Sequence, residues 1–369
     1  MKYYIIAGEA SGDLHGSNLI KALKKEDLKA EIRCWGGDLM EAAGGELAKH
    51  YKEMAFMGFL EVLLNLGTIF KNIRYCKEDI DKFSPDVIIF IDFSGFNLRI
   101  AQWAKKQNYT TNYYISPQVW ASRAGRVEKI KRDIDAMYVI LPFETEFYAR
   151  HGVEVSFVGH PLLDALANRP ETNPDSFRNT YGLDPDKPII ALLPGSRKQE
   201  VSRMLSIMLQ TASEFPEYQF VVAGAPSLDT SFYTEILKDS NAFLIPNKTY
   251  ELLSVSHAAL VTSGTATLET ALIGVPQVVC YKGNWLSYQI ARRIITLDYI
   301  SLVNLIMGKE VVEELIQSAL NPKNLSKSLR KILAGPDREV QIQAYQQLKE
   351  KLGGPGASLK TARLILEKM

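Results

Sequence analysis

The sequence has few cysteines, no long apolar run and almost no net charge, and each absence excludes a class of protein. Its three cysteines, Cys34, Cys76 and Cys280, are far apart in 369 residues and form no Cys-x-x-Cys pair. This argues against a disulfide scaffold and a structural zinc site. Lys and Arg number 43 against 42 Asp and Glu, and a net charge of +1 makes nucleic acid an improbable principal partner.

No uninterrupted apolar run approaches the roughly 20 residues that a membrane-spanning helix requires. The apolar stretch before Gly8 is too short for a secretory signal, so we expect a cytoplasmic protein. The most apolar segment, residues 54–66, is interrupted by Glu61 and Asn65 and followed by basic residues. It predicts either a buried core helix or a surface that contacts acyl chains or a membrane interface.

Short, nearly continuous apolar runs alternate with helical patterns, which indicates parallel sheets covered on both faces. The pattern restarts after a stretch rich in Pro, Asn and Asp, so we predict an α/β protein with two doubly wound, Rossmann-like domains facing a central cleft. The domains are placed at residues 1–167 and 168–345. A C-terminal helical segment, 346–369, is expected to pack on the first domain or on a second subunit. The expected strands are residues 3–6, 31–35, 87–91, 111–115, 136–140, 189–193, 219–223, 258–262 and 276–280.

The turn after the first expected strand reads Gly-Glu-Ala-Ser-Gly-Asp (8–13). In open α/β sheets ligands bind beyond the carboxyl ends of the strands, and glycines let the backbone approach them. Two acids, Glu9 and Asp13, suit sugar hydroxyls better than a phosphate. Alternatively, Ser11 or Asp13 caps the following helix.

Asp92 directly follows the strongly apolar strand at 87–91. A partly desolvated carboxylate there would have a raised pKa, as a general base requires. The alternative is a turn Asp that binds its own backbone.

Two turns of the second half combine small or hydroxyl residues with the start of a helix. Gly195, Ser196 and Arg197 suit a diphosphate, because backbone N–H groups and a forked cation converge there. Glu269 would accept hydrogen bonds from vicinal ribose hydroxyls. The alternatives are ordinary helix starts with a solvent-exposed Arg197 and Glu269. The second turn comprises Ser263, Gly264, Thr265, Ala266 and Thr267.

The sequence predicts no metal site. Its Asp-x-Asp triplets, at 79–81, 133–135 and 184–186, lie in charged stretches or the linker and are interpreted as solvated charges. Its five histidines are scattered, and no Gly-x-Ser-x-Gly elbow follows a strand, so Ser-His-Asp catalysis has no support.

Seven short motifs now make a specific comparison possible, of which Gly-Glu-Ala-Ser-Gly-Asp (8–13) and Pro-Gln-Val-Trp-Ala (117–121) are close to diagnostic. The chain resembles the lipid-A-disaccharide synthases, glycosyltransferase family 19 of the GT-B architecture. The resemblance implies that UDP-2,3-diacylglucosamine donates its sugar to 2,3-diacylglucosamine 1-phosphate, with inversion and without metal or other cofactor. The other motifs lie at residues 57–62, 141–144, 158–161, 193–197 and 263–269.

The resemblance also implies a protein bound peripherally to the cytoplasmic face of the inner membrane of a Gram-negative bacterium. Separately, the C-terminal segment leaves open a homodimer in which it packs on a second subunit. It favours the lipid-binding interpretation of the apolar segment, including Met57, Phe59, Leu60 and Leu63.

The resemblance assigns further residues, with two departures. The smaller departure is Val303 before Asn304, where the family tends to have Pro. Where the family commonly has Asp-x-Pro-Asp-Phe-Asn, this chain keeps the first acid, Asp92, and has Gly95 in place of the second. The base is therefore Asp92, Glu9 or Asp13. Further implied acceptor residues are Ser11, Gly12 and Asn97, and further implied nucleotide residues are Asn304, Glu310 and Gln317.

Other interpretations remain open at this level. They are a UDP-sugar 2-epimerase, a peptidoglycan-type N-acetylglucosaminyl transferase, and a two-domain ligand-binding protein without catalysis.

Overall fold

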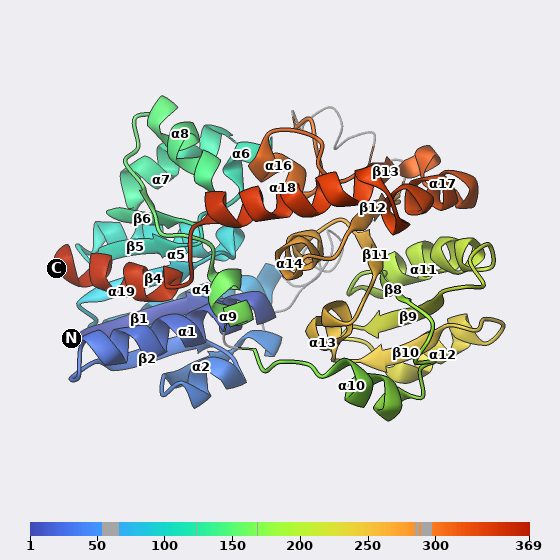
Figure 1. Ribbon diagram of the computed structural model, residues 1–369. Helices are drawn as coiled ribbons and strands as arrows, with labels where there is room; N and C mark the ends of the chain where they lie inside the picture. The colour runs from blue at the N-terminus through green and yellow to red at the C-terminus, as the bar shows by residue number, and fades with distance from the viewer. Residues whose placement is uncertain (54–65, 123, 168, 285–287, 289–296) are drawn as a thin grey trace. The chain divides into compact units, whose positions relative to one another are not determined.

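The computed structural model describes residues 1–53, 66–122, 124–167, 169–284, 288 and 297–369, and it divides into two α/β units (Figure 1). Unit 1 comprises Met1–Ala167 and Leu352–Met369, and unit 2 comprises Asn168–Lys351. The domain boundary expected at residue 345 falls inside helix α18 (Pro336–Leu352), and the division, between Lys351 and Leu352, lies six residues later because the helix continues without a break.

Unit 1 contains a seven-stranded parallel sheet in the order β3-β2-β1-β4-β5-β6-β7. Its strands are β1 Lys2–Ala7, β2 Glu31–Gly36, β3 Glu46–His50, β4 Val87–Ile91, β5 Thr110–Tyr114, β6 Ala136–Val139 and β7 Ser156–Phe157. Its α-helices are α1 Ala10–Glu26, α2 Asp38–Ala42, α4 Leu66–Phe83, α5 Ser94–Lys106, α6 Val119–Ser122, α7 Val127–Asp133, α8 Pro142–Arg150, α9 Pro161–Ala167 and α19 Ala357–Glu367.

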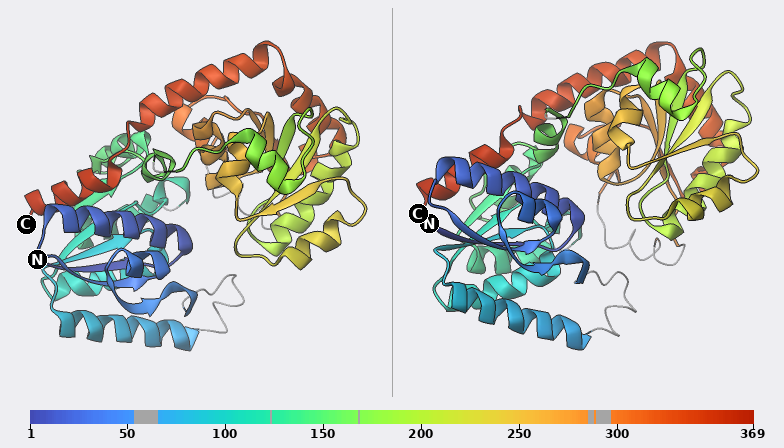
Figure 2. Two further views of the ribbon diagram at one scale, coloured as in Figure 1. Left: turned by 60° about the horizontal axis from the view of Figure 1, so that its bottom comes forward. Right: turned by 90° about the horizontal axis from the view of Figure 1, so that it is seen from below.

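Helices cover both faces of this sheet, as the views of Figure 2 show. Successive side chains of a strand point to opposite faces, so β1 contributes Tyr4 and Ile6 to one apolar core and Tyr3 and Ile5 to the other. The second core also contains residues of α1 and of the C-terminal helix α19, which pack against each other. The end of the chain thus completes the unit in which the chain begins.

Unit 2 contains a six-stranded parallel sheet in the order β10-β9-β8-β11-β12-β13. Its strands are β8 Ile189–Leu193, β9 Gln219–Gly224, β10 Phe243–Pro246, β11 Ala258–Thr262, β12 Gln277–Tyr281 and β13 Glu314–Ile316. Its helices besides α18 are α10 Pro174–Tyr181, α11 Lys198–Ala212, α12 Thr230–Leu237, α13 Thr249–Ser254, α14 Thr265–Ile273, α16 Leu302–Met307 and α17 Pro322–Leu333.

The predicted class, with two parallel and doubly wound sheets, is confirmed. The expected lipid-binding residues Met57, Phe59, Leu60 and Leu63 lie outside the described residues. Within the part of the chain that the structure describes, no helix is both long enough and apolar enough to cross a membrane.

Candidate functional site

The sheet of unit 1 reverses its strand order beside β1, which lies between β2 and β4. Ala7 pairs with Ile91 at the carboxyl ends of β1 and β4, so the turns that carry Glu9 and Asp92 are neighbours. Such a point of reversal is where open α/β sheets bind their ligands. The structure thus brings two of the three candidate acids together at a favourable place.

Asp92 has an unusual backbone conformation. Both Asp92 and Phe93 have positive φ angles, 43° and 46°, which side-chain-bearing residues rarely adopt. Asn97 Nδ2 donates to the carbonyl of Asp92 at 2.8 Å, and the Tyr113 hydroxyl donates to the same oxygen. Backbone strain held in this way is typical of functional sites, because the surrounding bonds offset its cost of about 1–3 kcal/mol per residue.

The electrostatic environment of Asp92 fits a general base. The side chain keeps solvent-exposed surface, yet enough protein surrounds the carboxyl that desolvation raises its pKa. The nearby charge of Glu9 raises it further, to about 6. Asp92 can therefore be ionised at neutral pH and still accept a proton.

Gly8 is required by the same turn. A Cβ atom at Gly8 would lie 2.3 Å from the ring of Phe93, the residue next to Asp92. The glycine thus lets Phe93 cover the backbone at the end of β1, where it also stacks on Phe96 with ring centroids 5.5 Å apart.

Asp13 caps a helix, as the alternative interpretation of the sequence proposed, but the helix is not the one that was expected. Its buried carboxylate accepts hydrogen bonds from the backbone N–H groups of Gly37, Leu39 and Met40, at 2.8–3.1 Å. It therefore caps the start of α2 rather than α1. Ser11 is exposed on the first turn of α1, and Gly12 is buried against Ala7, so of these two only Ser11 presents a side chain to solvent.

Asn97, expected at the acceptor, is fully buried. Its Nδ2 lies 3.4, 3.2 and 2.8 Å from the carbonyls of Ile6, Ile91 and Asp92, at the ends of β1 and β4. The amide nitrogen thus joins these strand ends and supports the backbone of the site, whereas the buried Oδ1 has no hydrogen-bond partner among the described residues.

Unit 2 has its own reversal point, between β8 and β11, where Leu193 pairs with Val261. The turn after β8 contains Gly195, whose φ of 112° favours glycine. Arg197 follows with a side chain that is 67% exposed and donates to Glu200 at 3.2 Å. This places a cation at the reversal point, as expected.

The turn after β11 leaves the start of α14 open. Gly264 is its N-cap residue and no side chain caps the first turn, so the backbone N–H groups of Thr265 and Ala266 can receive an anion. The Ser263 hydroxyl donates to Ile300 O at 3.0 Å, and the buried Thr267 hydroxyl donates to Gly264 O at 2.8 Å. Both hydroxyl groups thus donate within the protein in this structure.

Glu269 lies one turn further along α14. Its Oε1 accepts a hydrogen bond from the Tyr250 hydroxyl at 2.7 Å. Burial raises the pKa of Glu269, and the hydrogen bond opposes this rise. The sequence analysis missed Tyr250, because nothing in its local pattern distinguishes it from an ordinary helix residue.

Three further residues, Asn304, Glu310 and Gln317, were expected to bind the nucleotide. Asn304 is fully buried. Its amide bonds Val311 N, Val312 N and O, and Glu314 Oε1, at 2.7–3.0 Å, so it holds the chain before β13 instead of contacting a nucleotide. Glu310 is exposed. Gln317 follows β13 with a positive φ of 53°, and its buried Nε2 has no hydrogen-bond partner among the described residues.

Glu144 is a buried acid at the end of the motif at 141–144. The sequence analysis did not predict that its carboxyl would be buried and hydrogen-bonded. Its carboxyl accepts hydrogen bonds from Ser116, from Trp120 Nε1 at 3.3 Å and from two backbone N–H groups. Desolvation raises its pKa to about 7. It fixes the loop after β5, next to the Asp92 turn, since Asp92 N donates to Ile115 O at 3.3 Å.

No group of three or more His, Cys, Asp or Glu side chains among the described residues could hold a metal ion. The interpretation of the Asp-x-Asp triplets as solvated is wrong for two acids. Asp79 is buried and bonded to Arg33 and Tyr4, and Asp133 is buried and bonded to Arg132.

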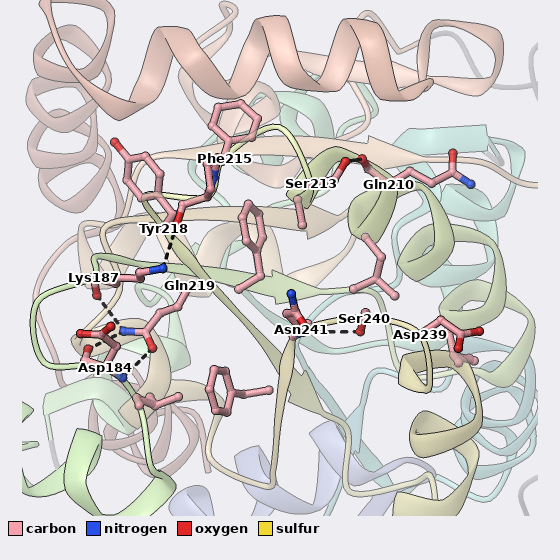
Figure 3. Close-up of a pocket in the computed structure, with 18 of the residues that line it drawn as sticks. Asp184, Lys187, Gln210, Ser213, Phe215, Tyr218, Gln219, Asp239, Ser240 and Asn241 are labelled. Atoms are coloured by element: carbon pink, nitrogen blue, oxygen red, sulfur yellow. Dashed lines mark hydrogen bonds between the residues drawn. The ribbon is translucent and has the colours of Figure 1, made fainter.

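A hollow of about 950 Å³ in unit 2 lies away from these turns (Figure 3). It is lined partly by the segments before β8, β9 and β10, including Lys187 and Tyr218, and by the first residue of β9, Gln219, and so lies at the amino ends of the strands. None of the expected nucleotide-binding residues lines it.

Solved structures share this fold over the whole chain. A UDP-GlcNAc 2-epimerase from Neisseria meningitidis superposes with a TM-score of 0.70 at 14% identity, covering 100% of both chains. The glycosyltransferase of kitacinnamycin superposes with a TM-score of 0.68 at 12% identity, covering 100% of this chain and 98% of the other. At such identities the likeness shows the fold alone, and that fold is of the GT-B type.

Sequence comparison gives the family. The family model for lipid-A-disaccharide synthetase matches residues 3–367. Proteins named lipid-A-disaccharide synthase from Syntrophus aciditrophicus and Geobacter metallireducens are 42% and 39% identical over 370 residues, covering 98% of this chain and 96% of each relative.

The fold and family together define a glycosyltransferase that acts on sugar-nucleotide and lipid substrates. The chain belongs to the lipid-A-disaccharide synthase family and functions in lipid A biosynthesis. Epimerase, peptidoglycan transferase and non-catalytic alternatives are not favoured.

Proposed function

We propose that this protein transfers the sugar of UDP-2,3-diacylglucosamine to the 6-hydroxyl of 2,3-diacylglucosamine 1-phosphate, with inversion and without a metal ion. The observation that carries the proposal is the chemistry at the two points of strand reversal. One has an acid with a raised pKa, Asp92, and the other has a cation, Arg197, beside an uncapped helix start at Thr265.

The donor diphosphate would bind in unit 2. The guanidinium of Arg197 and the first N–H groups of α14 suit the charge that collects on UDP as it leaves. Fixed donors lower the barrier when they interact more strongly with the transition state than with the ground state. Gly195, Ser196 and Gly264 supply close backbone approach, Glu269 would hold the ribose, and Glu310 and Gln317 would complete the nucleotide site.

The acceptor would bind in unit 1. Asp92 would remove the proton from the 6-hydroxyl as its oxygen attacks the anomeric carbon opposite UDP. Glu9 would bind acceptor hydroxyls and keep the Asp92 pKa high, and Ser11 would contribute its exposed hydroxyl. Asp13 remains the third candidate base, although its three backbone hydrogen bonds favour Asp92.

The proposal includes peripheral binding to the cytoplasmic face of a Gram-negative inner membrane. The apolar segment containing Met57, Phe59, Leu60 and Leu63 precedes α4, which exposes Phe70 (63%) beside Lys71 and Arg74. Aromatic and basic side chains together suit an anionic membrane surface. Flotation with vesicles containing anionic lipid should recover the protein at low salt, and Phe70→Asp should reduce recovery. No flotation at low salt would refute membrane binding.

A homodimer is also proposed, and sedimentation velocity on the full chain tests it. A single species at the mass of one 41.4 kDa chain would refute it.

The reaction is tested by incubating the protein with both acylated substrates in the presence of a chelator. Mass spectrometry should detect the tetra-acylated disaccharide phosphate together with UDP. Asp92→Asn should lower kcat by about 10²–10⁴, as loss of a general base typically does. Disaccharide formation that requires added metal would refute metal independence, and turnover of UDP-GlcNAc without acyl chains would favour the epimerase-like alternative.

A further inference from the structure

Tyr250 and Glu269 form a hydrogen-bonded pair at the carboxyl end of the unit 2 sheet. Tyr250 lies in the first turn of α13, which follows β10, and Glu269 lies in α14, which follows β11. The two helices pack against each other, and the Tyr250 hydroxyl lies 2.7 Å from Glu269 Oε1. The pair therefore joins two separate helices at the edge of the sheet that is proposed to bind the nucleotide.

The hydrogen bond from Tyr250 occupies one of the two carboxylate oxygens of Glu269. Tyr250 is the one described residue that donates to Glu269, and it donates to Oε1, so Oε2 keeps its capacity to accept. A side-chain carboxylate with one oxygen anchored and one open can present the open oxygen to a hydroxyl in a fixed direction. Without the anchor, the glutamate side chain would regain rotational freedom, and part of the binding energy would be lost in ordering it.

A donor without a partner lies close by. Nη1 of Arg169 is buried and has no hydrogen-bond partner among the described residues, and the guanidinium is near enough to act electrostatically on Tyr250. A ribose diol both donates and accepts hydrogen bonds. The open Oε2 of Glu269 can accept such a hydrogen bond and the unpaired Nη1 of Arg169 can donate one, and both groups lie near Tyr250.

We propose that Tyr250 is a positioning residue that holds Glu269 for the donor's ribose and thereby sets the preference for ribonucleotide over deoxyribonucleotide. The inference rests on the proposed role of Glu269. Tyr250 itself acts through the glutamate. Its importance is therefore predicted to appear in selectivity for the sugar hydroxyls, which a merely structural tyrosine would not affect.

The experiment measures the Kd of UDP, 2′-deoxy-UDP and 3′-deoxy-UDP by calorimetry. In the unmodified protein, at least one deoxy analogue should bind roughly tenfold more weakly than UDP, as loss of a hydrogen bond to a charged group implies. Tyr250→Phe should weaken UDP about three- to tenfold while changing the deoxy analogue little, so the ratio of the two Kd values approaches one.

Tyr218→Phe is the matched control, because it removes a phenol hydroxyl at the amino end of the same sheet, where no donor site is proposed (Figure 3). It should leave the ratio unchanged. Since all ligands are measured on one preparation, partial unfolding alters the number of sites and not the ratio of Kd values.

An unchanged ratio in Tyr250→Phe, with a collapsed ratio in Glu269→Ala, would overturn the inference and leave the proposed function standing. An unchanged ratio in both variants, or no discrimination in the unmodified protein, would overturn the ribose assignment of Glu269 and the inference with it.

Discussion

Glu9 and Asp92 follow adjacent parallel strands, and the charge of Glu9 contributes to raising the pKa of Asp92 to about 6. Neither residue is near the other in sequence. The pairing of Ala7 with Ile91 creates the relationship, so under the proposed mechanism Glu9 would help to determine the pH range in which Asp92 acts as a base.

Glu9→Gln should shift the pH profile of kcat/KM to lower pH. A general base must be deprotonated, so activity should fall as pH decreases through the Asp92 pKa. Removing the Glu9 charge lowers that pKa, and the acidic limb of the profile should move down by a few tenths of a unit or more. Glu31→Gln, at the amino end of β2, is the control and should leave the limb in place. A shift to higher pH would contradict the electrostatic relationship.

Gly8→Ala should destabilise the protein and lower its activity. The new methyl group would overlap the Phe93 ring, and overpacking of this kind costs about 1–3 kcal/mol. Relief of the overlap would displace Phe93 and the adjoining Asp92. Gly95→Ala is the matched control, because nothing lies within 4 Å of its Cβ and alanine favours the helix. Equal unfolding midpoints for the two variants in urea would refute the steric argument.

Asp13→Ala should lower the free energy of unfolding by about 2 kcal/mol, because three backbone N–H groups of α2 lose their acceptor. Asp38→Ala removes an exposed acid of the same helix, whose ion pairs are solvated, and should cost much less stability than Asp13→Ala. Chemical denaturation measures both. If Asp13→Ala kept full stability while activity fell by more than 10²-fold, Asp13 would be a direct participant.

Glu144→Gln should reduce the pH dependence of stability. The folded protein raises the pKa of Glu144 from 4.5 to about 7, so it binds this proton more tightly than the unfolded chain does. Tighter binding of this proton stabilises the folded protein by on the order of 3 kcal/mol below about pH 4.5. This contribution to the free energy of unfolding is lost as pH rises through 7. Urea unfolding at pH 5 and pH 8 should show a smaller difference for Glu144→Gln than for the unmodified protein. Glu128→Gln, which removes an exposed acid of α7, should behave like the unmodified protein.

The strands that sequence reasoning predicted are the inner strands of both sheets. Their residues are buried on both faces and therefore form apolar runs, such as Val87–Ile91 and Ile189–Leu193. The four strands it missed, β3, β7, β10 and β13, are the edges of the two sheets. An edge strand is short and partly exposed, so Glu46–His50 contains no residue that is fully buried and resembles a loop in sequence.

The candidate site was predictable in location but less so in side-chain direction. The polar residues that directly follow predicted strands lie at both points where the strand order of a sheet reverses. Whether a polar side chain there faces a ligand or the protein depends on partners distant in sequence, such as Gly37 for Asp13 and Ile6 for Asn97. The hydrogen bond of Tyr250 to Glu269 likewise joins residues on different helices, which no local pattern reveals.

The placement of α19 has a consequence for biosynthesis. Ala362 and Ile365 fill the core beside Leu19 and Ile20, so unit 1 lacks part of its interior until residues 352–369 leave the ribosome. Unit 2 is continuous in sequence and has every residue it needs sooner. The usual order of vectorial folding, in which the first segment made is the first to fold, is therefore reversed. A nascent chain that stalled after Lys351 would display an uncovered apolar face on α1, where chaperones or proteases could recognise it.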